Sequence, residues 1–259
     1  MLPTPPNPLL KIYGPLELSL FQFLVILAVV VGCELAYRQA RRAGLETEVI
    51  VRGSLWALGA GFFLSHLTSL ILYFPGTVKE NPLAMLMIWQ GHSSFGGFFG
   101  GVLGGLLYLR RRGIQPIPYL EAGFFGFVPA WIIARTGCTI AFDHPGRATD
   151  FFLGMADGAG VVRHNLGLYE MLFSVLLAAA LYGLRNARPF EGFHLALVIL
   201  LYSPVRFLLD TLRVEDRRYW GLTPGQYFSV LLLALGIWLL LRGRRTRGVY
   251  PNAGFTGER

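Results

Sequence analysis

Long apolar runs, separated by short polar connections, recur along nearly the whole chain. A transmembrane helix needs about 20 mostly apolar residues in succession. The runs that meet this requirement cover residues 17–37, 54–74, 83–109, 119–136, 168–184, 192–212 and 225–241. The pattern predicts an all-α polytopic membrane protein with about seven transmembrane helices. Because the connections are short, we expect residues 1–259 to form a single transmembrane helical domain, with residues 137–167 as an outer loop or small head region within it.

The composition excludes an ordinary soluble domain. Of the 259 residues, 54% are hydrophobic and 15% are charged, whereas soluble domains carry about 25% charged residues. No cleavable signal peptide is evident before the first apolar run, so we expect this run to remain as a helix. Cys33 and Cys138 are the two cysteines, and they are far apart in the sequence, so no disulfide framework is expected.

The distribution of positive charge predicts the orientation in the membrane. Arginines collect on alternate connections and on the tail, and positive residues accumulate on cytoplasmic loops. They are Arg38, Arg41, Arg42, Arg52, Arg110, Arg111, Arg112, Arg185, Arg188, Arg242, Arg244, Arg245 and Arg247. This distribution predicts an outside N-terminus and an inside C-terminus. We expect these arginines to contact anionic lipid head groups, and we expect no nucleic-acid partner.

A second set of cations lies on the predicted outer connections, against the orientation rule. These residues are Arg147, Arg163, Arg206, Arg213, Arg217 and Arg218. Cations in such positions suggest an anionic ligand, and at a membrane surface that is a phospholipid head group or a phosphate. The alternative is that they carry no function and are offset by Asp210, Glu215 and Asp216.

Ionisable residues at membrane depth are costly, which makes them candidates for a functional site. They are His66, His92, Arg135, Glu170, Arg206 and Asp210. All but His66 fall in the predicted outer half, and the spacing of Arg206 and Asp210 predicts an ion pair on one helix face. The residues therefore predict an outward-facing intramembrane site for an anionic amphiphile, in an enzyme of lipid head-group chemistry or in a lipid transporter.

Glycines crowd the third apolar run. Small residues let helices approach closely in lipid, so we expect Gly100, Gly101, Gly104 and Gly105 to pack against a neighbouring helix. Gly96 and Gly97 come shortly after His92 and are expected to line a cavity.

Residues 134–147 read Ala-Arg-Thr-Gly-Cys-Thr-Ile-Ala-Phe-Asp-His-Pro-Gly-Arg. This string resembles the signature of the prolipoprotein diacylglyceryl transferase family, Gly-Arg-x-Gly-Asn-Phe-x-Asn-x-Glu-x-x-Gly. Arg135, Gly137 and Gly146 match the signature, and Asp143 stands where the family has glutamate.

Further blocks extend the resemblance to nearly the whole chain. In chain order they are Gly14-Pro15-Leu16, Trp89-Gln90-Gly91, Arg163-His164 with Leu168-Tyr169-Glu170, Arg206-Phe207-x-x-Asp210-x-x-Arg213, and Gly225-Gln226. The resemblance also implies seven helices with the N-terminus outside.

The resemblance implies transfer of a diacylglyceryl group from phosphatidylglycerol to the lipobox cysteine of prolipoproteins, with release of glycerol phosphate. The implied partners are phosphatidylglycerol and prolipoprotein signal peptides, and the implied location is the bacterial inner membrane, with the site facing its outer half. No metal or cofactor is expected. The candidate catalytic residues are His92, Arg135, Arg206 and Asp210. The candidate substrate-binding residues are His66, Gly96, Gly97, Gly137, Cys138, Asp143, Gly146, Tyr169 and Glu170.

Several family residues are replaced in this chain. Cys138 and Ala141 stand where the signature has asparagine, Phe21 replaces a tyrosine, His66 replaces an arginine, and Gly96 replaces the histidine usually cast as the base. We expect His92, four residues before Gly96, to lie one helical turn away on the same face and to reach the vacated space. Two alternatives stay open: a related lipid-head-group transferase with another acceptor, and a non-catalytic phospholipid-binding or transport paralogue. Cys138 is expected to fill a small position, the alternative being a thiol that itself accepts an acyl or diacylglyceryl group.

Overall fold

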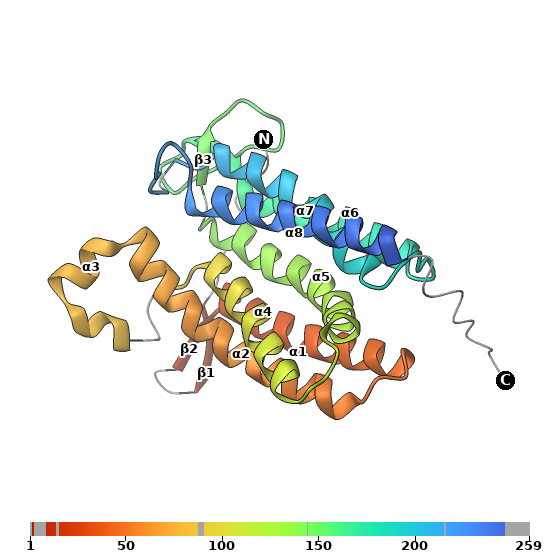
Figure 1. The fold of residues 1–259 in the computed structure, drawn as a ribbon. Coiled ribbons are helices and arrows are strands. Elements are labelled where there is room, and N and C mark those ends of the chain that lie inside the picture. Colours follow the sequence, from red (N-terminus) through yellow and green to blue (C-terminus); the bar gives the residue numbers. More distant parts are fainter. Residues whose placement is uncertain are drawn as a thin grey trace.

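The computed structural model describes residues 2, 9–13, 16–87, 91–143, 145–214 and 216–246. Most of them lie in long helices that pack into a bundle, with α5 between the group α1, α2 and α4 and the group α6, α7 and α8 (Figure 1). The long helices are α1 (Leu20–Arg42), α2 (Thr47–Thr68), α4 (Ser94–Arg111), α5 (Pro116–Ala141), α6 (Leu166–Gly183), α7 (Phe193–Thr211) and α8 (Pro224–Thr246). The largest buried apolar cluster joins α5, α6, α7 and α8.

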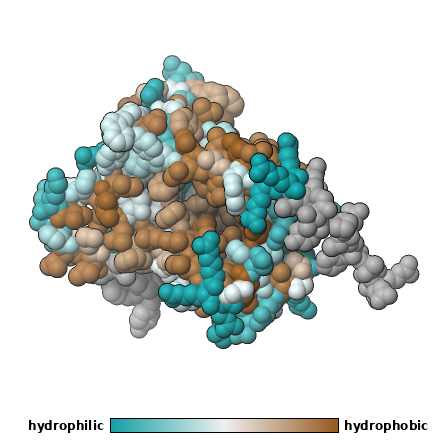
Figure 2. Space-filling model, viewed as in Figure 1, coloured by the Kyte–Doolittle hydropathy of each residue, from teal (hydrophilic) through white to brown (hydrophobic). Residues whose placement is uncertain are grey.

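The helices have the length and surface of membrane-spanning segments. Within the described part of the chain, six are long and apolar enough to cross a membrane: α1, α2 with its extension to Tyr73, α5, α6, α7 and α8. Large apolar side chains such as Leu176 and Leu231 point outward, and Figure 2 shows a hydrophobic surface across the middle of the molecule. The prediction of an all-α polytopic membrane protein is therefore confirmed. The count of seven, with α4 as the seventh, and the orientation of the termini stay predictions.

The third apolar run is broken, so the prediction of one continuous helix over residues 83–109 was wrong. After α2 the chain forms a π-helical turn, η1 (Ser69–Tyr73), then the short helices α3 (Pro75–Glu80) and η2 (Pro82–Leu86), and α4 begins only at Ser94. Gly91 has a φ of 57°, a left-handed conformation that does not continue a right-handed helix. The side chain of Ser93 then caps α4. Trp89 and Gln90 lie outside the described residues.

Two small antiparallel sheets lie at one end of the bundle (Figure 1). β1 (Leu9–Tyr13) pairs with β2 (Leu16–Ser19), while β3 (Pro145–Ala148), β4 (Met155–Ala156) and β5 (Val162–Asn165) form a sheet in the order β3-β5-β4. The second sheet falls within the expected head region. The expected start of that region at residue 137 was wrong, because α5 continues to Ala141 and ends where Phe142 takes a left-handed φ of 51°. Gly14 and Pro15 lie outside the described residues.

The arginine-rich connections share the opposite end of the bundle. The α1–α2, α4–α5 and α6–α7 connections lie away from β3 and α3, as does the end of α8 (Figure 1). Glu34 and Arg38 form an exposed ion pair there, with Nε and Oε1 2.6 Å apart. Arg247 lies outside the described residues.

Candidate functional site

Four charged side chains from three helices meet inside the bundle, toward the end that carries β3. Arg135 comes from α5, Glu170 from α6, and Arg206 and Asp210 from α7. Glu170 Oε2 lies 3.2 Å from Arg135 Nε and 3.4 Å from Arg206 Nη1, and Arg206 Nη2 lies 2.8 Å from Asp210 Oδ1. Each of the four residues is at most 4% exposed. The structure thus brings together four of the candidate residues, and the predicted Arg206–Asp210 ion pair forms.

Glu170 is the centre of this network. Besides the two guanidinium groups, its Oε1 accepts hydrogen bonds from the Tyr202 hydroxyl and from Trp131 Nε1, the latter at 3.2 Å. Buried carboxylates persist in proteins when they are paired and hydrogen-bonded in this way. Glu170 therefore fixes the positions of both arginines rather than facing open space.

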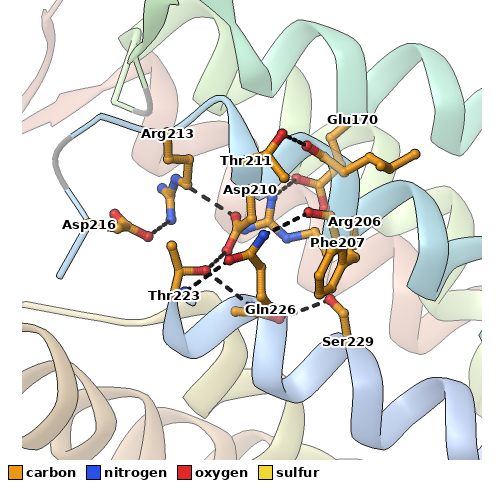
Figure 3. Close-up of polar contacts among 12 residues, drawn as sticks. Glu170, Arg206, Phe207, Asp210, Thr211, Arg213, Asp216, Thr223, Gln226 and Ser229 are labelled. Carbon is orange, nitrogen blue, oxygen red and sulfur yellow. Dashed lines mark hydrogen bonds and ion pairs between the residues drawn. The ribbon is translucent and has the colours of Figure 1, made fainter. Parts of the chain in front are cut away.

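Asp210 joins the network to the start of α8 (Figure 3). Thr223 Oγ1 donates to Asp210 Oδ2 at 2.5 Å and accepts from the backbone N–H of Gln226 at 3.1 Å, while Gln226 Oε1 accepts from Thr223 N at 3.0 Å. This reciprocal pattern is a capping box, which the sequence Thr-Pro-Gly-Gln encodes locally. A side chain at Gly225 would collide with Asp210 Oδ2. The close approach of α8 to α7 therefore requires glycine there.

Three polar atoms of the buried network lack a well-aligned hydrogen bond, and both guanidinium groups lie against aromatic rings. Within the described residues, Arg135 Nε, Arg206 Nε and Asp210 Oδ1 are buried and make no hydrogen bond. The Arg135 guanidinium lies 4.2 Å from the Trp131 ring centroid, and the Arg206 guanidinium lies 4.7 Å from that of Phe95. Arg135 Nε still lies 3.2 Å from Glu170 Oε2, and Asp210 Oδ1 lies 2.8 Å from Arg206 Nη2, so both atoms have charged partners. Of the three atoms, Arg206 Nε is the one with neither a hydrogen bond nor an ion pair among the described residues.

A polar cavity of about 240 Å³ adjoins Arg206. Three arginines line it, namely Arg206, Arg213 and Arg217, together with His92 from the segment before α4. Its other lining residues are Ser69, Tyr73, Phe74, Ser93, Ser94, Phe95, Asp143, Pro145 and Asp216. A cavity with three guanidinium groups is suited to a phosphate. Arg135 does not line this cavity; it lines a small apolar crevice of about 40 Å³ that shares Ser94 and Phe95 with the cavity.

Two carboxyl groups moderate the positive charge of the polar cavity. Burial raises the pKa of Asp143, although Arg135 and Arg213 act in the opposite direction. Burial also raises the pKa of Asp216, which pairs with Arg213 at 2.5 Å. In both groups burial outweighs the arginines that act in the opposite direction.

His92 lines the polar cavity but does not lie on α4. The prediction that His92 shares a helix face with Gly96 was wrong, because α4 begins at Ser94. The His92 ring lies 4.8 Å from the Phe62 ring and 6.2 Å from the His66 ring. Partial burial lowers its pKa, and the charge of His66 adds to this effect. The neutral imidazole, which can accept a proton, is therefore favoured near neutral pH.

Gly96 and His66 both serve packing around His92. A Cβ atom at Gly96 would lie 2.5 Å from Thr68 Cβ and 2.6 Å from the carbonyl oxygen of Leu64. The expected cavity at Gly96 is therefore absent, and α2 fills the space that His92 was expected to reach. The buried His66 ring places Nε2 3.0 Å from the carbonyl oxygen of Ala84 and Nδ1 3.3 Å from that of Gly91, which ties the η2–α4 segment to α2. His66 lines neither the polar cavity nor the groove described next.

A large apolar groove opens beside the polar cavity. It has a volume of about 990 Å³ and runs between α1, α2, α4 and α5. Gly97, Gly101 and Gly105 line it, whereas Gly100 and Gly104 pack against α2, where a Cβ atom would meet backbone oxygens at 2.6 and 2.5 Å. Gly101 and Gly105 also face α2, where a Cβ atom would lie 3.5 Å from the carbonyl oxygen of Ala57 and 4.0 Å from its Cβ, respectively, so the predicted packing is looser at these two positions. His92 lines both the groove and the polar cavity, so the two hollows meet there.

The remaining candidate residues surround the network without lining the polar cavity. Gly137 lets Phe21 of α1 pack closely, since a Cβ atom there would meet its ring at 3.1 Å. Cys138 is buried and accepts a hydrogen bond from Arg135 Nη1 at 3.5 Å. Gly146 forms a bridge with Arg213 that ties β3 to the end of α7. The Tyr169 hydroxyl lies 2.8 Å from His164 Nδ1, away from the cavity.

The candidate set omitted several residues that line the cavity. Arg213 and Arg217 belonged to the outer cations that break the orientation rule, and Arg213 also ends the Arg-Phe-x-x-Asp-x-x-Arg block, so both carried a signal. Ser69 and Tyr73 carried none, because they reach the cavity through η1, a π-helical turn that no pattern in the run indicates.

Comparisons with known proteins agree with this architecture. The model of the prolipoprotein diacylglyceryl transferase family matches residues 7–242. Similar proteins include one from Thermus thermophilus, 32% identical over 88% of this chain and 95% of its own length, and one from Roseobacter denitrificans, 28% identical over 91% and 94%. A third, from Streptococcus agalactiae, is 24% identical over 94% and 98%. Each is named as a phosphatidylglycerol–prolipoprotein diacylglyceryl transferase. The chain belongs to the prolipoprotein diacylglyceryl transferase family.

Proposed function

We propose that this protein transfers a diacylglyceryl group from phosphatidylglycerol to the lipobox cysteine of a prolipoprotein signal peptide. Membership of the family and the names of the relatives support the reaction. One observation carries the proposal: a cavity with three arginines meets a large apolar groove at His92. An anionic phospholipid needs both surfaces, because its phosphate requires cations and its acyl chains require an apolar lining.

The reaction is a substitution at carbon. The cysteine sulfur, as thiolate, attacks the diacylglycerol carbon that carries the phosphate ester, and a C–S bond forms as the C–O bond breaks. The electron pair of the C–O bond stays with the oxygen, so glycerol phosphate leaves with an additional negative charge. Arg206 and Arg213 face the cavity where that charge develops and stabilise it. Arg135 acts through Glu170, which holds Arg206 in place.

His92 is the group best placed to generate the thiolate. A free cysteine has a pKa of about 8.5, so a base must remove the proton near neutral pH. The lowered pKa of His92 favours the neutral ring that accepts this proton. Its position between the groove and the polar cavity matches the path of a lipid whose head and tails occupy the two hollows.

We also propose that the site lies in the outer half of the bacterial inner membrane. The chain is a multi-pass membrane protein, and its basic connections share the end opposite β3. Under the positive-inside rule that basic end is cytoplasmic and the arginine cavity lies toward the outer face. A signal peptide anchored in the membrane reaches the site from the side, through the groove.

The proposal is tested with the purified full-length protein in lipid nanodiscs. Transfer from phosphatidylglycerol to a lipobox peptide is followed by the mass gain of the peptide. Arg206→Ala should lower the rate by about 100- to 1,000-fold, the usual effect of removing a donor that stabilises developing charge. The control is Arg52→Ala, because Arg52 pairs with Glu48 on the exposed surface of α2 and should change the rate less than twofold. Absence of transfer by the wild-type protein would overturn the proposal.

The packing at Gly96 supports an alternative function. The family's histidine position is filled by α2 here, and Cys138 and Ala141 replace both signature asparagines. These changes fit a transferase of the same lipid with another acceptor, or a protein that binds the lipid without reaction. Release of glycerol phosphate in the absence of any thiol peptide would identify another acceptor, and tight binding without release would identify a binding protein.

A further inference from the structure

The three arginines of the polar cavity differ in how their charges are balanced. Arg206 pairs with Glu170 and Asp210, and Arg213 pairs with Asp216 and lies 4.0 Å from Asp210. Within the part of the chain that the structure describes, Arg217 forms no ion pair with a carboxylate, although it lines the same cavity. Among the described residues, Arg217 is thus the cavity arginine whose charge no carboxylate balances.

Tyr219 holds Arg217 at the cavity. The Arg217 guanidinium carbon lies 5.3 Å from the centroid of the Tyr219 ring, a cation–π arrangement. The Tyr219 hydroxyl donates to the carbonyl oxygen of Leu72 at 2.8 Å, in the last turn before the chain leaves η1. Carbonyls at the end of a helix lack helical partners, so this bond is well placed to form.

The anchoring of Tyr219 extends to α8. The Tyr227 hydroxyl donates to the Tyr219 carbonyl oxygen at 2.8 Å, and Tyr219 forms a bridge with Leu222. Tyr219 is thus fixed to η1 through its side chain and to α8 through its backbone. The connection that carries Arg217 is thereby held across the polar cavity, between two groups of helices.

We propose that Arg217 binds the departing glycerol phosphate in the polar cavity, and that Tyr219 is its positioning residue. This inference rests on the proposed transfer reaction. The lipid phosphodiester carries one negative charge, whereas a phosphate monoester carries about 1.5 to 2 at pH 7. A guanidinium that has no carboxylate partner among the described residues therefore stabilises the leaving group more than the bound lipid.

Arg218 provides a matched control from the neighbouring position. It carries the same charge and is also exposed, but it does not line the cavity. Its guanidinium donates to the carbonyl oxygens of Gly221 and Arg213, each at 3.2 Å, within its own connection. A general effect of positive charge on anions would be equal for Arg217 and Arg218, whereas direct binding requires Arg217.

The test uses the full-length protein in nanodiscs of zwitterionic lipid and titrates it with glycerol 1-phosphate by calorimetry. Arg217→Gln should weaken binding about tenfold, the lower end for a charge-assisted hydrogen bond, because the side chain is exposed. Arg218→Gln should change the affinity less than twofold. Tyr219→Phe keeps the ring but loses the bond to Leu72, and should give an intermediate loss. Melting temperatures identify any variant that fails to fold, and Arg217→Lys then replaces Arg217→Gln.

Equal weakening by Arg217→Gln and Arg218→Gln, or no weakening by either, would overturn the inference. Nanodiscs containing phosphatidylglycerol separate the two sources of phosphate. There, Arg217→Gln should raise the inhibition constant of glycerol 1-phosphate about tenfold while leaving the KM for the lipid within threefold; an equal change in both would assign Arg217 to the lipid head group and refute the inference. If the wild-type protein transfers the diacylglyceryl group but Arg217→Gln binds glycerol 1-phosphate as tightly as the wild type, this inference is wrong and the proposed function stands. Product binding that depends on Arg217, without transfer to a lipobox peptide, would remove the proposed function and keep the anion site.

Discussion

Replacing Glu170 by glutamine removes the negative charge at the centre of the buried network while nearly preserving the shape of the side chain. Two guanidinium groups, Arg135 at 3.2 Å and Arg206 at 3.4 Å, then lose their shared partner. Breaking a buried ion pair typically costs about 3–5 kcal/mol, because a charge is left without compensation. For a chain of this size, 1 kcal/mol corresponds to roughly 2–4 °C in melting temperature. We therefore expect Glu170→Gln to lower the melting temperature by roughly 6–20 °C.

The matched control is Glu34→Gln. Glu34 also pairs with an arginine, at 2.6 Å from Arg38, but the two side chains are 51% and 63% exposed. Exposed pairs contribute about 0–1 kcal/mol, so this variant should melt within a few degrees of the wild-type protein. Both variants are measured by thermal unfolding in the same detergent. Equal melting temperatures for the two variants, or a Glu170→Gln variant more stable than the wild type, would refute the buried network as the structure places it.

Three further predictions concern the site and the topology. Gly96→Ala should destabilise the protein by about 1–3 kcal/mol through overpacking against α2, whereas Gly123→Ala, with open space around its Cβ position, should be nearly neutral in the same unfolding assay. The transfer rate should fall only at a pH below the ordinary histidine pKa of about 6.5, because the pKa of His92 is lowered and its neutral form must accept the proton. In His92→Gln the rate should drop about 100- to 10,000-fold and should no longer decrease as the pH is lowered through this range. Cysteines placed at the exposed positions Lys79 and Arg188 should be labelled from the outer face only at position 79, and the reverse pattern would also invalidate the placement of the site.

The membrane architecture and part of the buried network could be predicted from the sequence. Apolar runs of sufficient length define helices without knowledge of tertiary contacts, and the four-residue spacing of Arg206 and Asp210 places them on one helix face. The capping box at Thr223 and Gln226 is also local, so it is readable from four consecutive residues. What the spacing does not give is the partner of Arg135, because Glu170 lies 35 residues further along the chain, on another helix.

The segment before α4 shows why the rest of the site was missed. Residues 83–109 look like one apolar run, yet the short helix η2 ends at Leu86 and α4 begins only at Ser94. Between them, Gly91 has a left-handed backbone conformation. A glycine permits either conformation, so the sequence does not say which one is used. His92 therefore sits in a loop beside the cavity instead of on a helix face. Arg217 was flagged by its charge, but its place in the cavity depends on the Tyr219–Leu72 hydrogen bond, which joins residues distant in sequence.

The most direct measurement couples the two products of the proposed reaction. The wild-type protein in nanodiscs receives phosphatidylglycerol labelled in its head-group glycerol, together with a lipobox peptide that carries either cysteine or serine at the modified position. Labelled glycerol phosphate should appear in equal amount to the diacylglyceryl-modified cysteine peptide, and neither product should appear with the serine peptide. Release of glycerol phosphate that is independent of the cysteine, or no release despite bound phosphatidylglycerol, would contradict diacylglyceryl transfer as the function of this protein.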